Sequence, residues 1–146
     1  MTPYGPLLFF LHLRYNLAPM VKLNYAKLGG LVPAVIQDWR TQEVLMLGFM
    51  NPQAFKKTLQ TSKVHFYSRS RQTLWMKGEI SGNLQAVKEI LVDCDRDSLL
   101  IRVEQKGGAA CHTGYRSCFH RKVGRKGLVA VRQRKVFDPE KVYKRD

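Results

Sequence analysis

Residues 31–50 read LVPAVIQDWRTQEVLMLGFM, and this stretch decides how the chain begins to fold. Leu31–Gln37 is apolar and rich in β-branched residues, which is typical of a strand. A polar break follows, and Val44–Met50 is a second apolar run. Two apolar runs around a short polar break predict a β-hairpin.

The residues after this hairpin predict one helix and then further short strands. Asn51-Pro52 is typical of a helix start, with an N-cap residue before a proline at the first position, and the helix should end near Ser62. Short apolar runs predict strands at Val64–Tyr67, Leu74–Met76, Val87–Val92, Leu99–Val103 and Val129–Val136. This pattern predicts an α+β fold that is mostly antiparallel β with one or two short helices.

Length, composition and charge point to one basic domain. The chain has 146 residues, of which 45% are hydrophobic, and this suits a single domain with a sizeable core. The net charge is +14, and residues 119–146, with ten basic and three acidic side chains, carry half of it. Such an excess of base favours phosphate-bearing partners. We expect residues 20–121 to form the domain and residues 122–146 to be a basic segment packed on it.

The first 19 residues differ from the rest of the chain. Their apolar run, Leu7–Leu13, is far shorter than the roughly 18 apolar residues of a membrane span, and no secretory signal is recognisable. We interpret residues 1–19 as an N-terminal extension or as a misassigned start, with Met20 as the true one. Three cysteines cannot all pair within one chain, so we expect free or metal-bound thiols in a reducing cytoplasm, and no membrane association.

The first group of residues that indicates chemistry is Asp93-Cys94-Asp95-Arg96-Asp97. Three carboxylates at alternate positions are hard oxygen ligands, which suit Mg²⁺. If the segment is extended, the three aspartates face one way and Cys94 faces the other. The alternative is a solvated acidic loop between two strands.

The second group is Cys111-His112 with Cys118 seven residues later. Thiolates and imidazoles are ligands that zinc prefers. Cys111, Cys118 and Cys94 together would leave one coordination position open for water, as in catalytic zinc sites. A closed structural site that uses His112 or His120 is the alternative, and the spacing alone does not separate the two.

The third group is the basic loop Ser68-Arg69-Ser70-Arg71, which is followed by Trp75, Lys77 and Glu79. Hydroxyl and guanidinium groups in a short loop can hold a phosphate, because arginine makes bidentate, charge-assisted hydrogen bonds. The alternative is a solvated basic turn.

Taken in order, these segments resemble the phosphoribosyl-AMP cyclohydrolase family. Tyr67, Ile80 and His120 replace residues that are common in the family, and none of the three is an expected metal ligand. Several ordered motifs are a more specific signal than any one of them. The matching stretches, which lie between Leu31 and Arg121, are HFYSRSR (65–71), LWMKGE (74–79), SGN (81–83), VDCDRD (92–97), CHTG (111–114) and RSCF (116–119).

The resemblance implies an interlocked homodimer with metal sites at the subunit interface. Asp93, Asp95 and Asp97 would bind one Mg²⁺ per subunit. Cys111 and Cys118 would bind one Zn²⁺ per subunit together with Cys94 of the partner subunit. The substrate-binding residues would be Ser68, Arg69, Ser70, Arg71, Trp75, Lys77 and Glu79.

The activity that the resemblance implies is the third step of L-histidine biosynthesis. The substrate, 1-(5-phosphoribosyl)-AMP, is a nucleotide whose adenine ring is opened by hydrolysis of the N1–C6 bond. Ribosylation of N1 makes the ring electron-poor, so C6 is open to a water activated at zinc. His112 is the expected general base and acid.

Two other functions are weaker interpretations. The net charge and the basic tail would suit a zinc-containing nucleic-acid-binding module, but such a module has no need of three aspartates beside a cysteine. A zinc-dependent nucleoside deaminase would need His-x-Glu and Cys-x-x-Cys pairs, which the sequence lacks. Nucleic acid is therefore not an expected partner.

Overall fold

The computed structural model describes residues 21–131 and 134–143, so the interpretation of residues 1–19 lies outside the described part of the chain. It contains α2 and α3, two 3-10 turns (η1 and η2) and eight strands. The elements are η1 (Ala26–Leu28), β1 (Val32–Asp38), β2 (Val44–Met50), α2 (Pro52–Thr61), β3 (His65–Ser68), β4 (Thr73–Met76), β5 (Gln85–Val92), β6 (Leu99–Gln105), η2 (Lys106–Gly108), β7 (Arg121–Gly124), β8 (Gly127–Ala130) and α3 (Pro139–Val142).

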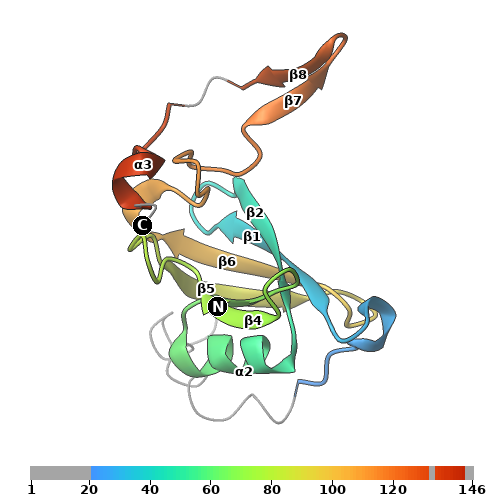
Figure 1. The fold of residues 1–146 in the computed structure, drawn as a ribbon. Helices are drawn as coiled ribbons and strands as arrows, with labels where there is room; N and C mark the ends of the chain where they lie inside the picture. Colours follow the sequence, from blue (N-terminus) through green and yellow to red (C-terminus); the bar gives the residue numbers. More distant parts are fainter. Residues whose placement is uncertain (1–20, 132–133, 144–146) are drawn as a thin grey trace.

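The main sheet has four strands in the order β2-β1-β6-β5 (Figure 1). The β1–β2 and β5–β6 pairs are antiparallel, and the hairpin predicted over residues 31–50 is confirmed. β3 and β4 form a separate antiparallel pair, so the predicted α+β fold with mostly antiparallel strands is also confirmed. The parallel pairing of β1 with β6 was not predicted.

One face of the sheet forms the core. Val32, Ala34 and Ile36 alternate along β1 with less buried residues, as expected for a strand with one covered face. Helix α2 and the β3–β4 pair lie on this side, and Phe66 is fully buried there. A Cβ atom at Gly48 would come within 2.4 Å of the Phe66 ring, so only glycine fits beneath it.

Helix α2 begins where the sequence predicts. The Asn51 side chain accepts a hydrogen bond from the amide of Ala54 at 2.8 Å, and Pro52 occupies the first turn. The helix ends at Thr61, and Ser62 follows in the left-handed conformation, with φ of 56°. No helix in the described ranges is long and apolar enough to cross a membrane.

The opposite face of the sheet carries an apolar row. The strand register aligns Leu47 with Val35, Val35 with Leu100, and Leu100 with Leu91, so four aliphatic side chains run across all four strands. The two end members are exposed, Leu47 at 44% and Leu91 at 40%. We call these four residues the aliphatic row.

The segment between β5 and β6 is a tight, exposed turn, so the extended form considered for Asp93–Asp97 does not occur and the alternative, an acidic loop between two strands, is the one observed. The amide of Arg96 donates to the carbonyl of Asp93 at 3.2 Å, and Arg96 has a φ of 61°. The Asp93 carboxylate accepts hydrogen bonds from the amides of Asp97 and Ser98 and from the Ser98 hydroxyl. Aspartate side chains that bond nearby amides in this way favour turns over strands.

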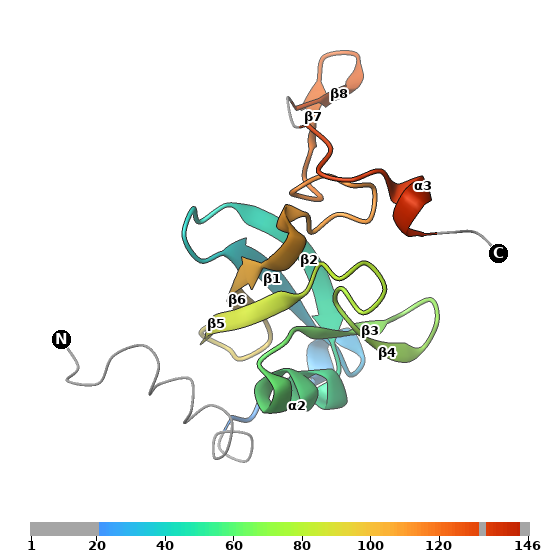
Figure 2. The same cartoon turned by 90° about the vertical axis from the view of Figure 1, so that its left-hand side faces the viewer.

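The basic tail does not form the single strand predicted at Val129–Val136. β7 and β8 form a hairpin that projects away from the sheet (Figure 2), and Val123 on it is 86% exposed. The chain then returns to the body, where Lys135 forms an isolated β-bridge with Tyr115. The two parts of residues 122–146 are therefore placed differently: the β7–β8 hairpin projects from the body, and the described residues after it return to the cysteine loop.

The loop that carries Cys111 and Cys118 is fixed to the β1–β2 hairpin. The Arg116 guanidinium donates to Asp38 and to Glu43, each at 2.8 Å. The amide of Cys118 donates to the carbonyl of Leu45 at 2.8 Å. Because Arg116 lies between the two cysteines, this clamp sets the position of both.

We expect Asp38→Asn to weaken this clamp in a pH-dependent manner. Desolvation opposes ionisation of Asp38, but hydrogen bonds from the amides of Thr41 and Arg40 and from Arg116 outweigh it and lower the pKa of the carboxyl below its ordinary 3.8. A carboxyl with a lowered pKa stabilises the fold above its unfolded-state pKa, and this contribution is lost as the pH falls through the folded-state pKa. The variant should lose about 1–3 kcal/mol of unfolding free energy at pH 7.

Urea unfolding at pH 7, 5 and 3 measures this difference, which should shrink at the lowest pH. Glu89→Gln is the control, because Glu89 makes a partly exposed ion pair with Arg102 and should contribute less than about 1 kcal/mol. A difference between wild type and Asp38→Asn that stays constant with pH would contradict the role of the charge.

Candidate functional site

A cavity of about 1230 Å³ brings together most of the residues that the sequence analysis singled out. Its walls come from the turn between β3 and β4, the end of β4 and the loop after it, the cysteine loop, and α3. This volume suffices for a nucleotide. The predicted site residues that line it are Ser68, Ser70, Arg71, Trp75, Lys77, Glu79, His112 and Cys118.

Two of the predicted site residues lie beside this cavity without lining it. The Arg69 guanidinium is over the ring of Phe49, 4.1 Å from its centroid, in a cation–π contact. Cys111 is buried behind the cavity wall, with its sulfur 2.9 Å from the Thr113 hydroxyl. The alternative zinc ligand His120 stacks on Tyr115, with the ring centroids 3.9 Å apart.

A tight turn places the two loop cysteines next to each other. The amide of Gly114 donates to the carbonyl of Cys111 at 3.0 Å, and the amide of Cys111 donates to the carbonyl of Tyr115 at 3.1 Å. Although Cys118 is exposed as a residue, desolvation of its thiol and the adjacent Cys111 raise its pKa to about 12. Without a metal this thiol is protonated at neutral pH, so a metal that binds it must displace a proton.

Lys77 is a cation that interacts electrostatically with the two cysteines. Its side chain is buried, and desolvation lowers its pKa, whereas the nearby Cys118 and Cys111 act in the opposite direction. The backbone turns sharply after it at Gly78, where φ is +86° and a Cβ would lie 2.4 Å from the Asn83 backbone. A lysine in this place lowers the pKa of Cys118 and so opposes part of the rise caused by desolvation and by Cys111.

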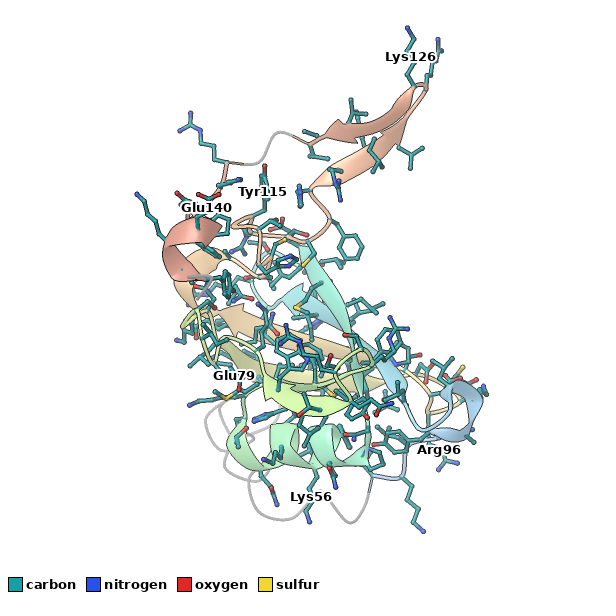
Figure 3. All side chains as sticks on the ribbon, viewed as in Figure 1. Lys56, Glu79, Arg96, Tyr115, Lys126 and Glu140 are labelled. Carbon is teal, nitrogen blue, oxygen red and sulfur yellow. The ribbon has the colours of Figure 1, made fainter. Side chains whose placement is uncertain are left out.

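The acidic turn lies at the other end of the molecule. The ligand oxygens of Asp93, Asp95 and Asp97 are within 4.8 Å of one another, and among residues 21–131 and 134–143 this is the one such group of three. β6 starts just after this turn and ends just before the cysteine loop, and its seven residues span about 20 Å. Figure 3 labels Arg96, which lies in the acidic turn, and Glu140, which lies on α3 at the opposite end of β6.

The donor set of the acidic turn suits a hard cation. The Lys27 ammonium already pairs there with Asp95 and, at 2.8 Å, with Asp97. Both oxygens of Asp93 are engaged in the turn, so this residue supports the loop as well as the cluster. Three carboxylates around a cation are the ligands that Mg²⁺ takes in proteins.

The cysteine loop alone offers fewer ligands than zinc requires. Cys111 and Cys118 supply two sulfurs, and Cys94 of the same chain lies in the distant acidic turn. In the part of the chain that the structure describes, no third histidine, cysteine or carboxylate joins this pair in a ligand cluster. A four-coordinate site therefore needs ligands from outside this chain or from solvent.

The sequence analysis missed the residues that α3 contributes. Pro139, Glu140 and Tyr143 line the cavity, although they follow Cys118 by some twenty residues. Asp138-Pro139 repeats the N-cap and proline pattern of Asn51-Pro52, and Asp138 accepts a hydrogen bond from the amide of Glu140 at 3.1 Å. That pattern could have indicated the helix, but nothing in it indicates a site.

Comparisons with known proteins agree with the motifs. Residues 46–120 match the family model described as phosphoribosyl-AMP cyclohydrolase. Three similar proteins of that name come from Desulforapulum autotrophicum (55% identical over 125 residues, 86% of this chain and all of that protein), Desulfatibacillum aliphaticivorans (57% over 126 residues, 86% and 100%) and Methanothrix thermoacetophila (58% over 117 residues, 80% and 93%). These matches do not support a nucleic-acid-binding module. The chain belongs to the phosphoribosyl-AMP cyclohydrolase family.

Proposed function

We propose that this chain hydrolyses the N1–C6 bond of the adenine ring of 1-(5-phosphoribosyl)-AMP, the third step of L-histidine biosynthesis. The observation that carries the proposal is the cavity, where His112 and Cys118 face the Ser68–Arg71 turn and the residues after β4. These motifs lie far apart in the sequence and meet at one site, in a chain whose family is named for this reaction.

His112 is the residue we assign to proton transfer. It borders the cavity directly after Cys111. Water adds to C6 and gives up a proton to the imidazole, and the proton passes to N1 as the N1–C6 bond breaks. The exocyclic nitrogen stays on the product as a carboxamide, so no ammonia leaves.

The Ser68–Arg71 turn is the site we assign to a phosphate. The Ser68 hydroxyl accepts from the amide of Arg71 at 3.2 Å and lies 3.4 Å from the Ser70 hydroxyl, which gathers two hydroxyls and one guanidinium at the cavity. Arg69 would have to leave the ring of Phe49 to reach a substrate. Arg71 is therefore the main phosphate ligand of this turn.

The metals are assigned to the two ligand groups. Cys111 and Cys118, with Cys94 of the partner subunit, would hold one Zn²⁺, which supplies Lewis acidity that lowers the pKa of water. Asp93, Asp95 and Asp97 would hold one Mg²⁺, which neutralises phosphate charge.

The distribution of these groups supports a homodimer. Cys94 and the acidic turn are about 20 Å from the cysteine loop of the same chain, so a second copy must supply them if both metals serve one site. The aliphatic row offers an apolar surface for that copy. A two-fold axis parallel to the row would reverse the strand direction in the second copy, so that its acidic turn would point towards the cysteine-loop end of the first chain.

A cytoplasmic location suits this chemistry. All three cysteines are free, and an oxidising compartment would threaten a site that depends on thiolates. The substrate is also a phosphorylated metabolite, which is made inside the cell. We therefore assign the protein to the cytoplasm.

His112→Ala should keep its zinc and lose most of its activity. The loss of a general acid–base group commonly lowers the rate by about 10²–10⁴-fold. Turnover is followed by the ultraviolet change as the purine opens, and zinc is measured by elemental analysis. Full turnover by the variant, or stoichiometric ammonia from the wild type, would show that the residue or the bond is wrongly assigned.

Asp95→Asn should raise the Mg²⁺ concentration needed for half-maximal activity, because it removes one charge from the acidic turn. Zinc content should stay near the proposed one ion per subunit. Titration of activity with Mg²⁺, beside elemental analysis of the same sample, separates the two metals. Loss of zinc in this variant would contradict the assignment of ligands.

Mixing inactive Cys94→Ala chains with inactive Cys111→Ala chains should restore part of the activity. In a shared site, each mixed dimer contains one zinc site with all its ligands intact. The chains are unfolded together, refolded and assayed against each parent refolded alone. Mixtures that stay inactive would indicate a site formed within one chain.

The surface used by this dimer can be tested in parallel. Leu47→Glu places a charge in the aliphatic row and should shift the protein towards monomer in sedimentation experiments. Val123→Glu, on the projecting β7–β8 hairpin, is the matched control and should stay dimeric. Dissociation of the control instead would move the interface to that hairpin.

A further inference from the structure

The segment that leads to α3 is fixed against the cysteine loop at one point. The amide of Val136 donates to the carbonyl of Gly114 at 2.7 Å. A Cβ at Gly114 would lie 2.2 Å from the carbonyl oxygen of Phe137, so the backbones of these two segments are in direct contact. Gly114 also has a φ of +96°, which glycine adopts without strain. The tail therefore docks two residues from His112.

This contact directs α3 onto the cavity. Asp138 caps the helix, and the amide of Tyr143 donates to the carbonyl of Pro139 at 2.8 Å, which closes it after one turn. The Phe137 and Tyr143 rings lie 6.3 Å apart and support each other. As a result, Glu140 and Tyr143 line the cavity together with His112 and Thr113. Glu140 is labelled on α3 in Figure 3.

The cavity lining carries charges of both signs: Arg71 and Lys77 are cations, and Glu79 and Glu140 are carboxylates. Arg71, on the Ser68–Arg71 turn, is the cation that suits a phosphate. Glu140 and Tyr143 are attached to the cysteine loop, where the ring is opened. An adenine with a substituent on N1 carries a positive charge, unlike the neutral adenine of AMP. A carboxylate and an aromatic ring are the groups that attract such a cation.

We propose that α3 is the specificity element of the site: Glu140 and Tyr143 contact the positively charged N1-substituted adenine and select it over neutral adenine nucleotides. The inference rests on the proposed function, because that function supplies the cationic purine. It adds to the site two residues that lie beyond the matched family region, residues 46–120.

The test compares the binding of two nucleotides that differ in this charge. The probes are 1-methyl-AMP, whose adenine is cationic at neutral pH, and AMP, and both are titrated calorimetrically into the full-length protein. Wild type should prefer 1-methyl-AMP. Glu140→Gln and Tyr143→Leu should each lower that preference about two- to fivefold while the affinity for AMP stays the same.

Two further variants separate recognition from structure. Tyr143→Phe keeps the ring and should keep the preference. Lys141→Gln changes a neighbouring charge on α3 that does not line the cavity, and it should also keep the preference. Equal loss of affinity for both nucleotides would show that α3 supports the cavity without recognising the charge of the purine. An unchanged preference in every variant would show that α3 does not contact the nucleotide. Either result overturns the inference.

The outcome is independent of whether the proposed reaction occurs. Turnover of 1-(5-phosphoribosyl)-AMP by wild type is measured on the same preparation. Turnover without any preference for 1-methyl-AMP overturns the role of α3 alone. A preference that depends on Glu140 and Tyr143 without turnover supports this role and overturns the proposed reaction.

Discussion

Strand β6 is the constraint on which the site depends. It is hydrogen-bonded on one side to β1 and on the other to β5, so it can neither bend nor slide without breaking two ladders. The acidic turn precedes it and the cysteine loop follows it. The two ligand groups of one chain are thus held apart by the length of a strand, and no loop motion within that chain closes the gap.

The cysteine loop needs its own support because it has little regular structure. Arg116 supplies it through two ion pairs with the β1–β2 hairpin, at the position between the cysteines. Of its two partners, Asp38 is buried and Glu43 is partly exposed, so one ion pair is shielded from water and the other remains hydrated. Such a geometry avoids the full desolvation cost of a buried ion pair while still fixing the loop.

The sequence predicts those elements whose stabilising interactions are local. The hairpin over residues 31–50 and the helix after Asn51 follow from hydrophobic pattern and capping, and both are confirmed. For Asp93–Asp97 the sequence left an extended segment and a loop as alternatives, because the hydrogen bonds from the following amides to the Asp93 side chain, which form the turn, are not visible in an alternating pattern. The parallel β1–β6 pairing and the return of α3 to the cavity depend on contacts between distant residues, so sequence patterns do not encode them visibly.

The site, like the fold, was predictable only where its features are local in the sequence. Its motifs carry recognisable ligand types, but their separation along β6 and the α3 wall appear only in the folded chain. Within the acidic turn, Lys27 occupies the position that a metal ion would take. Its single charge pairs with Asp95 and Asp97 while the carboxylate of Asp93 is engaged in the turn itself. A divalent cation bound as proposed would compete with Lys27, and because these groups are exposed, that competition should weaken as salt rises.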